Sequence, residues 1–110
     1  MHKKDSALIF PSAYTANQSA LWTLCKKLEG IEIYSDELNH ASMIQGIKNA
    51  NVKVHIFRHN DTEHLEELLK TSNANTPKMI VFESLYSMDG LRSPIEKIIW
   101  LAEKYNALTY

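Results

Sequence analysis

His40 is the residue of this chain whose type and position are best suited to chemistry. It follows a short apolar segment, residues 32–35, and precedes a helical pattern at residues 41–49. Ligands gather at such junctions in α/β folds, because strand carboxyl ends open into a crevice and helix amino ends present free N–H groups. An imidazole at this position can stack on a flat cofactor, titrate near neutral pH or bind a metal.

The residues around His40 narrow these possibilities. Asn39 and Ser42 offer capping groups of their own, so the helix does not require the histidine as its cap. Three further histidines are scattered over an expected strand, a loop and a helix, with no cysteine nearby: His55, His59 and His64. A metal site needs several ligands at suitable spacing. We therefore expect no metal site, and stacking of the His40 ring on a planar ligand stays open.

Two further junctions carry polar residues. Residues 12–17 join an expected strand to a helix, and their small side chains allow a phosphate to approach the helix N–H groups. An ordinary helix start, capped by Thr15 or Asn17, is the better explanation of this segment taken alone. Residues 83–90 follow a buried apolar strand and hold a carboxylate, hydroxyls and an Asp-Gly turn, which suit a polar ligand site or a plain turn.

Several common site patterns are missing from the sequence. There is no GxGxxG string and no Walker lysine, so neither a dinucleotide site nor a P-loop has support. Ser87 does not lie in a GxSxG string, which argues against a triad nucleophile. Residues 58–61 are expected to form a loop and a helix cap. Cys25 lies on the apolar stripe of its helix and is expected in the core.

Apolar segments of two kinds alternate along the chain and would position these residues. Short runs typical of strands lie at residues 7–10, 32–35, 53–57, 79–82 and 107–110. Helical patterns separate them at residues 17–28, 41–49, from 61 or 62 through 69, and 94–105. This alternation predicts an α/β fold with right-handed crossovers and a mostly parallel sheet with flanking helices. The last run is shorter than an average strand, so we expect a truncated domain.

The composition limits the classes of function. The chain has 110 residues, enough for one domain or part of one, and a net charge of −1, so nucleic acid is not an expected partner. Cys25 is the only cysteine, which excludes an internal disulfide and favours a reducing compartment. No apolar run is long enough to span a membrane, and no signal peptide is evident. We expect a cytoplasmic protein, or a mitochondrial matrix protein that has lost a presequence.

Three strings together resemble the α-oxoamine synthases, enzymes that use pyridoxal 5'-phosphate (PLP) to condense an amino acid with an acyl-CoA. They are Ser-Ala-Tyr-Thr-Ala-Asn at 12–17, Asn-His-Ala-Ser at 39–42 and Ser-Met-Asp-Gly at 87–90. The resemblance covers residues 6–110 and implies part of the large domain of a fold-type I PLP-dependent transferase. Segments 33–46, 57–61 and 82–84 are most similar to the branch that makes 5-aminolevulinate for tetrapyrrole and heme synthesis.

The resemblance implies a role for five residues at the cofactor. The backbone amides of Ala13 and Tyr14 would hold the PLP phosphate. His40 would stack on the pyridine ring and act as a catalytic residue by influencing proton movement there. Ser87 would hydrogen-bond the phenolic oxygen of the cofactor, and Glu83 would be a supporting polar residue.

The resemblance also implies the substrates and their contacts. Glycine and succinyl-CoA would give 5-aminolevulinate, coenzyme A and CO2. Ser35 matches a position that contacts the acyl-CoA. Lys53 lies near a basic position that contacts the CoA moiety, but it is shifted from that position by one residue. Family members are homodimers with the active site at the subunit interface.

In full-length relatives the Schiff-base lysine and the aspartate that pairs with the pyridine nitrogen follow the segment that ends at Tyr110. The chain is therefore expected to be a partial PLP-binding domain, truncated at both ends and inactive alone. Two alternatives remain. One is a segment of a sister α-oxoamine synthase with other substrates, and the other is a non-catalytic α/β module from a split gene. An assay of a completed chain with several acyl-CoAs separates them.

Overall fold

The computed structural model describes residues 13–83 and 94–110, the first two of these as backbone only. Helices and strands alternate throughout this part of the chain: α1 (Ala13–Lys27), β1 (Glu32–Asp36), α2 (Ala41–Ala50), β2 (Lys53–Phe57), α3 (Thr62–Lys70), β3 (Lys78–Val81), α4 (Ile95–Lys104) and β4 (Leu108–Thr109). Each falls close to a segment expected from the sequence, although α1 begins four residues earlier. The strand expected at residues 7–10 lies outside the described residues.

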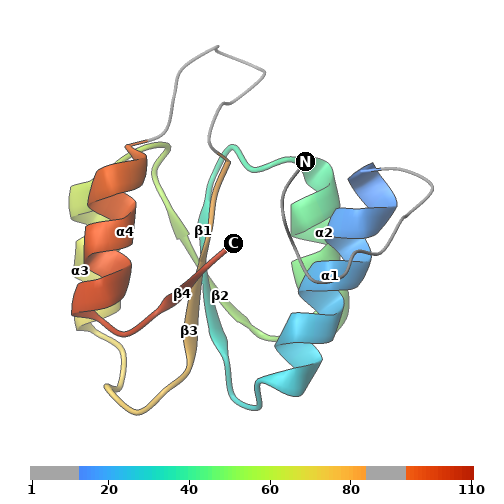
Figure 1. Ribbon diagram of the computed structural model, residues 1–110, viewed down its shortest axis with the longest axis horizontal. Coiled ribbons are helices and arrows are strands. Elements are labelled where there is room, and N and C mark those ends of the chain that lie inside the picture. The colour runs from blue at the N-terminus through green and yellow to red at the C-terminus, as the bar shows by residue number, and fades with distance from the viewer. Residues whose placement is uncertain (1–12, 84–93) are drawn as a thin grey trace, which may run out of the picture.

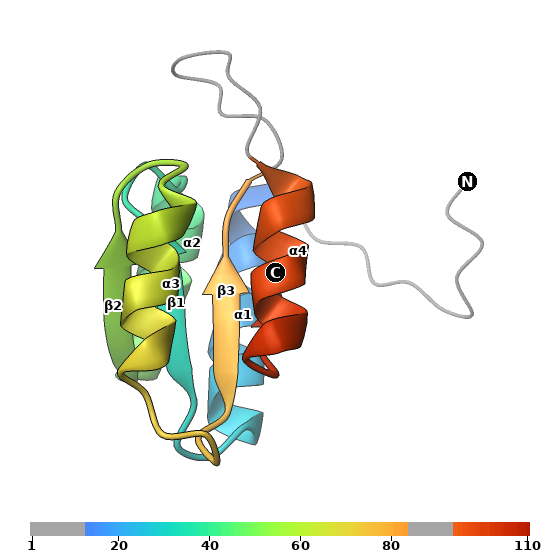
Figure 2. The same ribbon diagram turned by 90° about the vertical axis from the view of Figure 1, so that its left-hand side faces the viewer.

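The four strands form one parallel sheet in the order β2-β1-β3-β4. This confirms the predicted α/β fold with a parallel sheet. Helices α1 and α2 cover one face of the sheet, and α3 and α4 cover the other (Figure 1). Seen from the second face, α3 lies over β1 and β2, whereas α4 lies toward β3 (Figure 2). No helix of the described part is long and apolar enough to cross a membrane.

Strand alternation divides the core between the two faces, because successive side chains of a strand point to opposite sides. Between the sheet and α1–α2 lies a cluster of buried residues: Leu21, Cys25, Ile31, Ile33, Met43, Ile47, Ala50, Met79 and Val81. Between the sheet and α3–α4 lies a second cluster: Tyr34, Phe57, Leu65, Leu69, Ile80, Ile98, Leu101 and Ala102. Cys25 is therefore a core residue, as expected, and burial raises the pKa of its thiol.

Helices α1 and α2 approach each other closely at Gly46. A Cβ atom at this position would lie 2.9 Å from the Gln18 carbonyl oxygen and 3.2 Å from that of Asn17. Real Cβ atoms do not approach backbone atoms this closely, so only glycine allows the observed packing of the two helices. The contact holds the middle of α2 against the first turns of α1.

Candidate functional site

All four helices begin at the edge of the sheet where the strands end (Figure 1). Parallel strands place their carboxyl ends together, and each following helix starts there with N–H groups that lack intrahelical acceptors. The polar residues singled out in the sequence therefore converge on one edge, which we call the carboxyl edge.

His40 caps helix α2, although Asn39 and Ser42 also offered capping groups in the sequence. Its Nδ1 accepts a hydrogen bond from the Ser42 backbone N–H at 3.1 Å and lies 2.9 Å from the Ser42 hydroxyl. Because Nδ1 is the acceptor, the proton of the neutral ring resides on Nε2. The cap fixes the orientation of the imidazole, since one ring nitrogen is held against the helix end.

Asn39 is not a cap because its side chain joins two strand ends instead. The amide nitrogen donates to the Ser35 hydroxyl at 2.9 Å and to the Val81 carbonyl at 2.8 Å. Asn39 is 5% exposed and Ser35 is 3% exposed, so both hydrogen bonds are shielded from water. Asn39 thus connects the end of β1 to the end of β3 immediately before His40.

Glu83, which follows β3, contacts the backbone of His40. Its Oε2 accepts a hydrogen bond from the His40 N–H at 3.0 Å. The residue therefore lies beside the histidine, at the position where the sequence suggested a supporting polar group. Ser87 lies outside the described residues.

Helix α1 contributes a hydrogen-bonded chain from the other side of His40. Asn17, expected as a possible cap, lies inside α1 and donates to the Ser42 hydroxyl at 3.0 Å. The Tyr110 hydroxyl donates to the Asn17 side-chain oxygen at 3.0 Å. Burial raises the pKa of the Tyr110 phenol, so the hydroxyl keeps the proton that it donates. Residues from both ends of the described chain thereby support the cap of α2.

A second group of polar residues surrounds the buried carboxylate of Asp36. Its Oδ1 accepts from the Leu38 N–H at 2.8 Å and lies 3.0 Å from the His59 Nδ1, while Oδ2 accepts from the Asn60 N–H at 3.0 Å. The carboxylate therefore holds the loop after β2 against the loop after β1. Nothing in the sequence pattern indicated this connection.

Residues 58–61 otherwise form the loop and cap that the sequence predicted. The Asp61 side chain accepts from the His64 N–H at 3.0 Å and so caps α3. This hydrogen bond, together with one from the Arg58 guanidinium at 2.9 Å, lowers the pKa of the Asp61 carboxyl. The described residues contain no group of three or more His, Cys, Asp or Glu side chains that could hold a metal ion.

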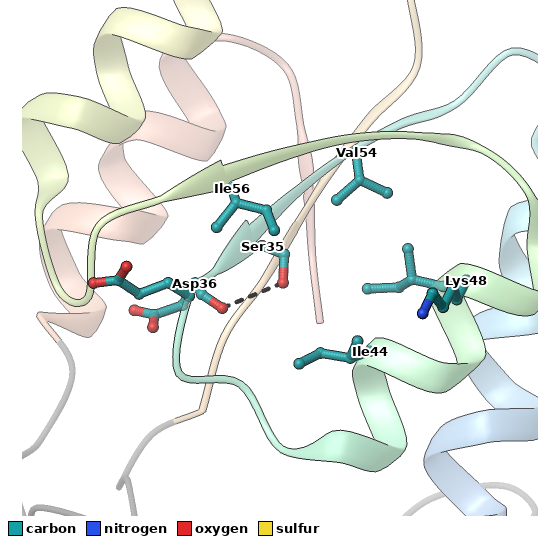
Figure 3. Close-up of a pocket in the computed structure, with 8 residues that line it drawn as sticks. Ser35, Asp36, Ile44, Lys48, Val54 and Ile56 are labelled. Carbon is teal, nitrogen blue, oxygen red and sulfur yellow. Dashed lines mark hydrogen bonds between the residues drawn. The ribbon is translucent and has the colours of Figure 1, made fainter.

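A pocket of about 220 Å³ lies between α2 and the strands β1 and β2 at the carboxyl edge (Figure 3). Its lining consists of Ser35, Asp36, Glu37, Ile44, Ile47, Lys48, Val54 and Ile56. Ser35, which the sequence suggested as a substrate contact, is thus part of a pocket wall. Lys53 is not, because Val54 lines the pocket and the preceding side chain of the strand points to the opposite face.

The carboxyl edge has the donors that a phosphorylated aromatic cofactor requires. Ala13 and Tyr14 are the first two residues of α1, so their backbone N–H groups have no acceptor within the helix and suit an anion. His40 begins the next helix at the same edge, and its cap fixes the orientation of its ring. By their chemistry, the free N–H groups suit a phosphate and the imidazole suits a planar ring.

The sequence indicated the residues with distinctive side chains, but not the hydrogen-bond partners that hold them or the other residues that line the pocket. The Asn17–Ser42 contact and the Lys48 side chain in the pocket were not anticipated. The first joins residues that meet only in the folded chain. The helical spacing of Ile44, Ile47 and Lys48 was a signal that could have indicated the second, because residues three or four apart share one helix face.

Comparison with known proteins adds independent information. The family described as aminotransferase class I and II matches residues 1–110, which is the whole chain. Among curated proteins, the chain is 56% identical over 110 residues to the erythroid-specific mitochondrial 5-aminolevulinate synthase of Danio rerio, and covers 19% of that protein. It is 56% identical to the mitochondrial enzyme of Saccharomyces cerevisiae, of which it covers 20%. For the 5-aminolevulinate synthase of Rickettsia bellii the values are 54% and 27%.

Solved structures agree with the fold. A structure of SPT with PLP superposes with a TM-score of 0.89 at 30% identity, covering 96% of this chain and 26% of that chain. Serine palmitoyltransferase of Sphingomonas wittichii gives the same TM-score, 0.89, at 30% identity over 96% of this chain and 26% of that chain. The chain thus spans about a fifth to a quarter of the length of the relatives that it matches.

Proposed function

The chain belongs to the class I and II aminotransferase family, and from this premise we propose that it forms part of a PLP-dependent 5-aminolevulinate synthase. That enzyme condenses glycine with succinyl-CoA and yields 5-aminolevulinate, coenzyme A and CO2, a reaction of heme and tetrapyrrole synthesis. The residues described above supply part of its PLP-binding large domain.

One observation carries this proposal. The identity to 5-aminolevulinate synthases is 54–56% over the whole chain, whereas the solved serine palmitoyltransferases, which also superpose over nearly all of it, are 30% identical. A sister enzyme with another amino acid and acyl-CoA is therefore the weaker candidate. A non-catalytic module is weaker still, since the residues suited to the cofactor are retained.

The cofactor, when bound, supplies an electron sink for carbanion chemistry at the amino acid. In our proposal the N–H groups of Ala13 and Tyr14 hold its phosphate at the start of α1. The His40 ring stacks on the pyridine plane, in the orientation set by the hydrogen bond from the Ser42 N–H to Nδ1. Glu83 holds the His40 backbone in place by accepting a 3.0 Å hydrogen bond from its N–H. Ser87 would contact the phenolic oxygen.

The acyl-CoA is proposed to bind next to this cofactor. Ser35 lines the pocket between α2 and β2 and also accepts the hydrogen bond from Asn39, the residue before His40. A substrate that contacts Ser35 in the pocket would thus be linked to His40 through one intervening residue, Asn39. We also propose Lys53, on the other face of β2, as a contact for a more distant part of the CoA.

The quaternary state and the location of the protein follow the same proposal. We expect a homodimer, as in the resembling enzymes. The similar proteins include mitochondrial enzymes and one from Rickettsia bellii, so either a mitochondrial or a bacterial cytoplasmic location agrees with the proposal.

The test is an assay of the protein completed with its flanking sequences. Purified protein with PLP, glycine and succinyl-CoA is expected to release 5-aminolevulinate, and serine with palmitoyl-CoA is expected to give no product. The 110-residue chain alone serves as the control and is expected to be inactive. Product from serine and palmitoyl-CoA, with none from glycine and succinyl-CoA, would instead favour the sister enzyme.

A matched pair of substitutions separates the two tasks of His40. His40→Asn keeps an acceptor that caps helices well but removes the aromatic ring. His40→Phe keeps a ring for stacking but removes the cap, at about 1 kcal/mol of stability. If stacking and proton movement depend on the imidazole, kcat falls by about 100-fold in both variants, while only His40→Phe loses thermal stability. An unchanged kcat in both variants, with a stability loss in His40→Phe alone, would leave His40 as a structural cap only.

A further inference from the structure

A second pocket lies at the amino edge of the sheet, which is the edge opposite the carboxyl edge and the place where α3 and α4 end (Figure 1). The last turns of both helices, the loop after α3 and the start of β3 form its walls. Its volume is about 320 Å³, and pockets that bind a small molecule measure about 300–1,000 Å³. None of the residues proposed for the cofactor or the acyl-CoA lines it.

Three lysines and no acidic residue are found among the described residues that line this pocket: Lys70, Lys78 and Lys104. Lys70 and Lys104 occupy the last turns of α3 and α4, where a cation is favourable beside the carbonyl groups of a helix end. The position of these two lysines therefore has a structural reason of its own. Lys78 begins β3, so the same reason does not apply to it.

Lys78 is a buried cation, since the residue is only 3% exposed. Its Nζ donates to the Asn73 carbonyl at 2.9 Å and to the Thr76 carbonyl at 3.0 Å, and an ammonium group has a third N–H to donate. In the described part of the chain it forms no ion pair with a carboxylate. A buried charge is costly unless it has a partner of opposite charge, so the pocket calls for an anion.

The neighbouring carboxylate of Glu66 offsets only one of the three lysines. It accepts hydrogen bonds from the Lys104 Nζ and from the Tyr105 hydroxyl, both at 2.8 Å. Lys70 acts on Glu66 through its charge, but it forms no ion pair within the described residues. Lys70 and Lys78 thus leave two positive charges in the pocket without a carboxylate partner.

We propose that this pocket binds a small phosphorylated molecule, whose phosphate group meets Lys78 and Lys70. A phosphate ester carries about 1.5 to 2 negative charges at pH 7, which matches the two lysines, whereas a single carboxylate matches only one. Lysine ammonium groups bind phosphate as compact point charges with rotatable donors. The site lies at the opposite edge of the sheet from His40, so the inference does not depend on the proposed synthase activity.

The experiment is calorimetry on the complete protein that contains this chain, saturated with PLP so that the phosphate site proposed at α1 is filled. The probes are inorganic phosphate, glycerol phosphate and malonate, a dicarboxylate of similar charge, all at one ionic strength. Lys78→Met removes the buried charge and keeps an apolar stem, and Lys70→Ala removes an exposed lysine that forms no ion pair. Lys27→Ala is the matched control, because Lys27 lies in the last turn of α1 and outside the pocket.

Both phosphate probes are expected to bind the wild-type protein more tightly than malonate does. Lys78→Met should weaken their binding about tenfold and Lys70→Ala about threefold, while Lys27→Ala should stay within about twofold of wild type. If Lys78→Met melts at a lower temperature than wild type, the comparison rests on Lys70→Ala, which loses no structural contact.

Three results overturn the proposal. The first is the absence of binding by either phosphate probe up to about 10 mM, a concentration that fills even a site of millimolar affinity. The second is phosphate binding that is unchanged in Lys70→Ala and in a stably folded Lys78→Met. The third is binding of malonate as tight as that of the phosphates, which would make the pocket a general anion site.

Discussion

Asn39 offers the sharpest test of how the carboxyl edge is held together. Its amide nitrogen donates to the Ser35 hydroxyl at 2.9 Å and the Val81 carbonyl at 2.8 Å, in a site where Asn39 is 5% exposed. Asn39→Ala removes both hydrogen bonds and leaves the carbonyl oxygen without this donor. Asn39→Asp keeps the shape of the side chain but places a carboxylate oxygen against the carbonyl.

The two substitutions differ in magnitude. The lost hydrogen bond to the Ser35 hydroxyl costs about 1 kcal/mol, and leaving the buried Val81 carbonyl without this donor costs about 1–3 kcal/mol, so Asn39→Ala should lower the free energy of unfolding by about 2–4 kcal/mol. Asn39→Asp buries an uncompensated charge at neutral pH, which costs about 3–5 kcal/mol. Native domains are stable by only about 5–15 kcal/mol, so either loss is a large fraction of the total.

The pH dependence distinguishes the carboxylate from a simple packing defect. The carbonyl oxygen of Val81 and the exclusion of water raise the pKa of the introduced carboxyl in the folded state above its unfolded value of about 3.9. The folded variant therefore binds the proton more tightly than the unfolded chain. Its deficit relative to wild type should shrink as the pH falls from 7 toward 4, since a protonated carboxyl can donate to the Val81 carbonyl.

Urea denaturation followed by circular dichroism at pH 7 and pH 5 measures these differences. Asn49→Ala is the matched control, because this exposed asparagine accepts only a surface hydrogen bond from Gln45 at 2.8 Å, and its loss should change stability by less than about 0.5 kcal/mol. An Asn39→Ala variant as stable as the control would refute the reasoning. So would an Asn39→Asp deficit that is the same at both pH values.

Two further predictions concern the packing of the helices. Gly46→Ala should lower the free energy of unfolding by up to about 2 kcal/mol in urea denaturation, because overpacking against the Gln18 backbone costs about 1–3 kcal/mol and the higher helix propensity of alanine returns about 1 kcal/mol. A gain in stability would contradict the close approach. Hydrogen bonds from Lys104 and then Tyr105 lower the pKa of Glu66. The ionised Glu66 therefore stabilises the folded state above the unfolded pKa of about 4.3, and this stabilisation is lost as the pH falls through the folded pKa. Melting temperatures of Glu66→Gln should therefore vary less than those of wild type between pH 5 and 3, and parallel curves would show that the ion pair contributes nothing.

Local patterns in the sequence were sufficient for the secondary structure and the fold class. The strand Lys53–Phe57 and the cap of α3 by Asp61 occur where the sequence predicted them. Apolar periodicity and capping side chains act within a few residues, so they can be interpreted without knowing the rest of the fold. The same signals led to the parallel α/β sheet, and the motif resemblance led to His40 and to Glu83 beside it.

Only the tertiary structure decided how these residues are supported and which of them share a pocket. Asn39 meets Val81 across 42 residues of chain, and Asn17 meets Ser42 across 25. Such contacts depend on the strand order β2-β1-β3-β4, which periodicity does not encode. For the same reason, the sequence could not show which side chains share the pocket, where Val54 and Ile56 of β2 meet Lys48 of α2. A strand has two faces, and the helix packed against one of them determines which side chains line the pocket.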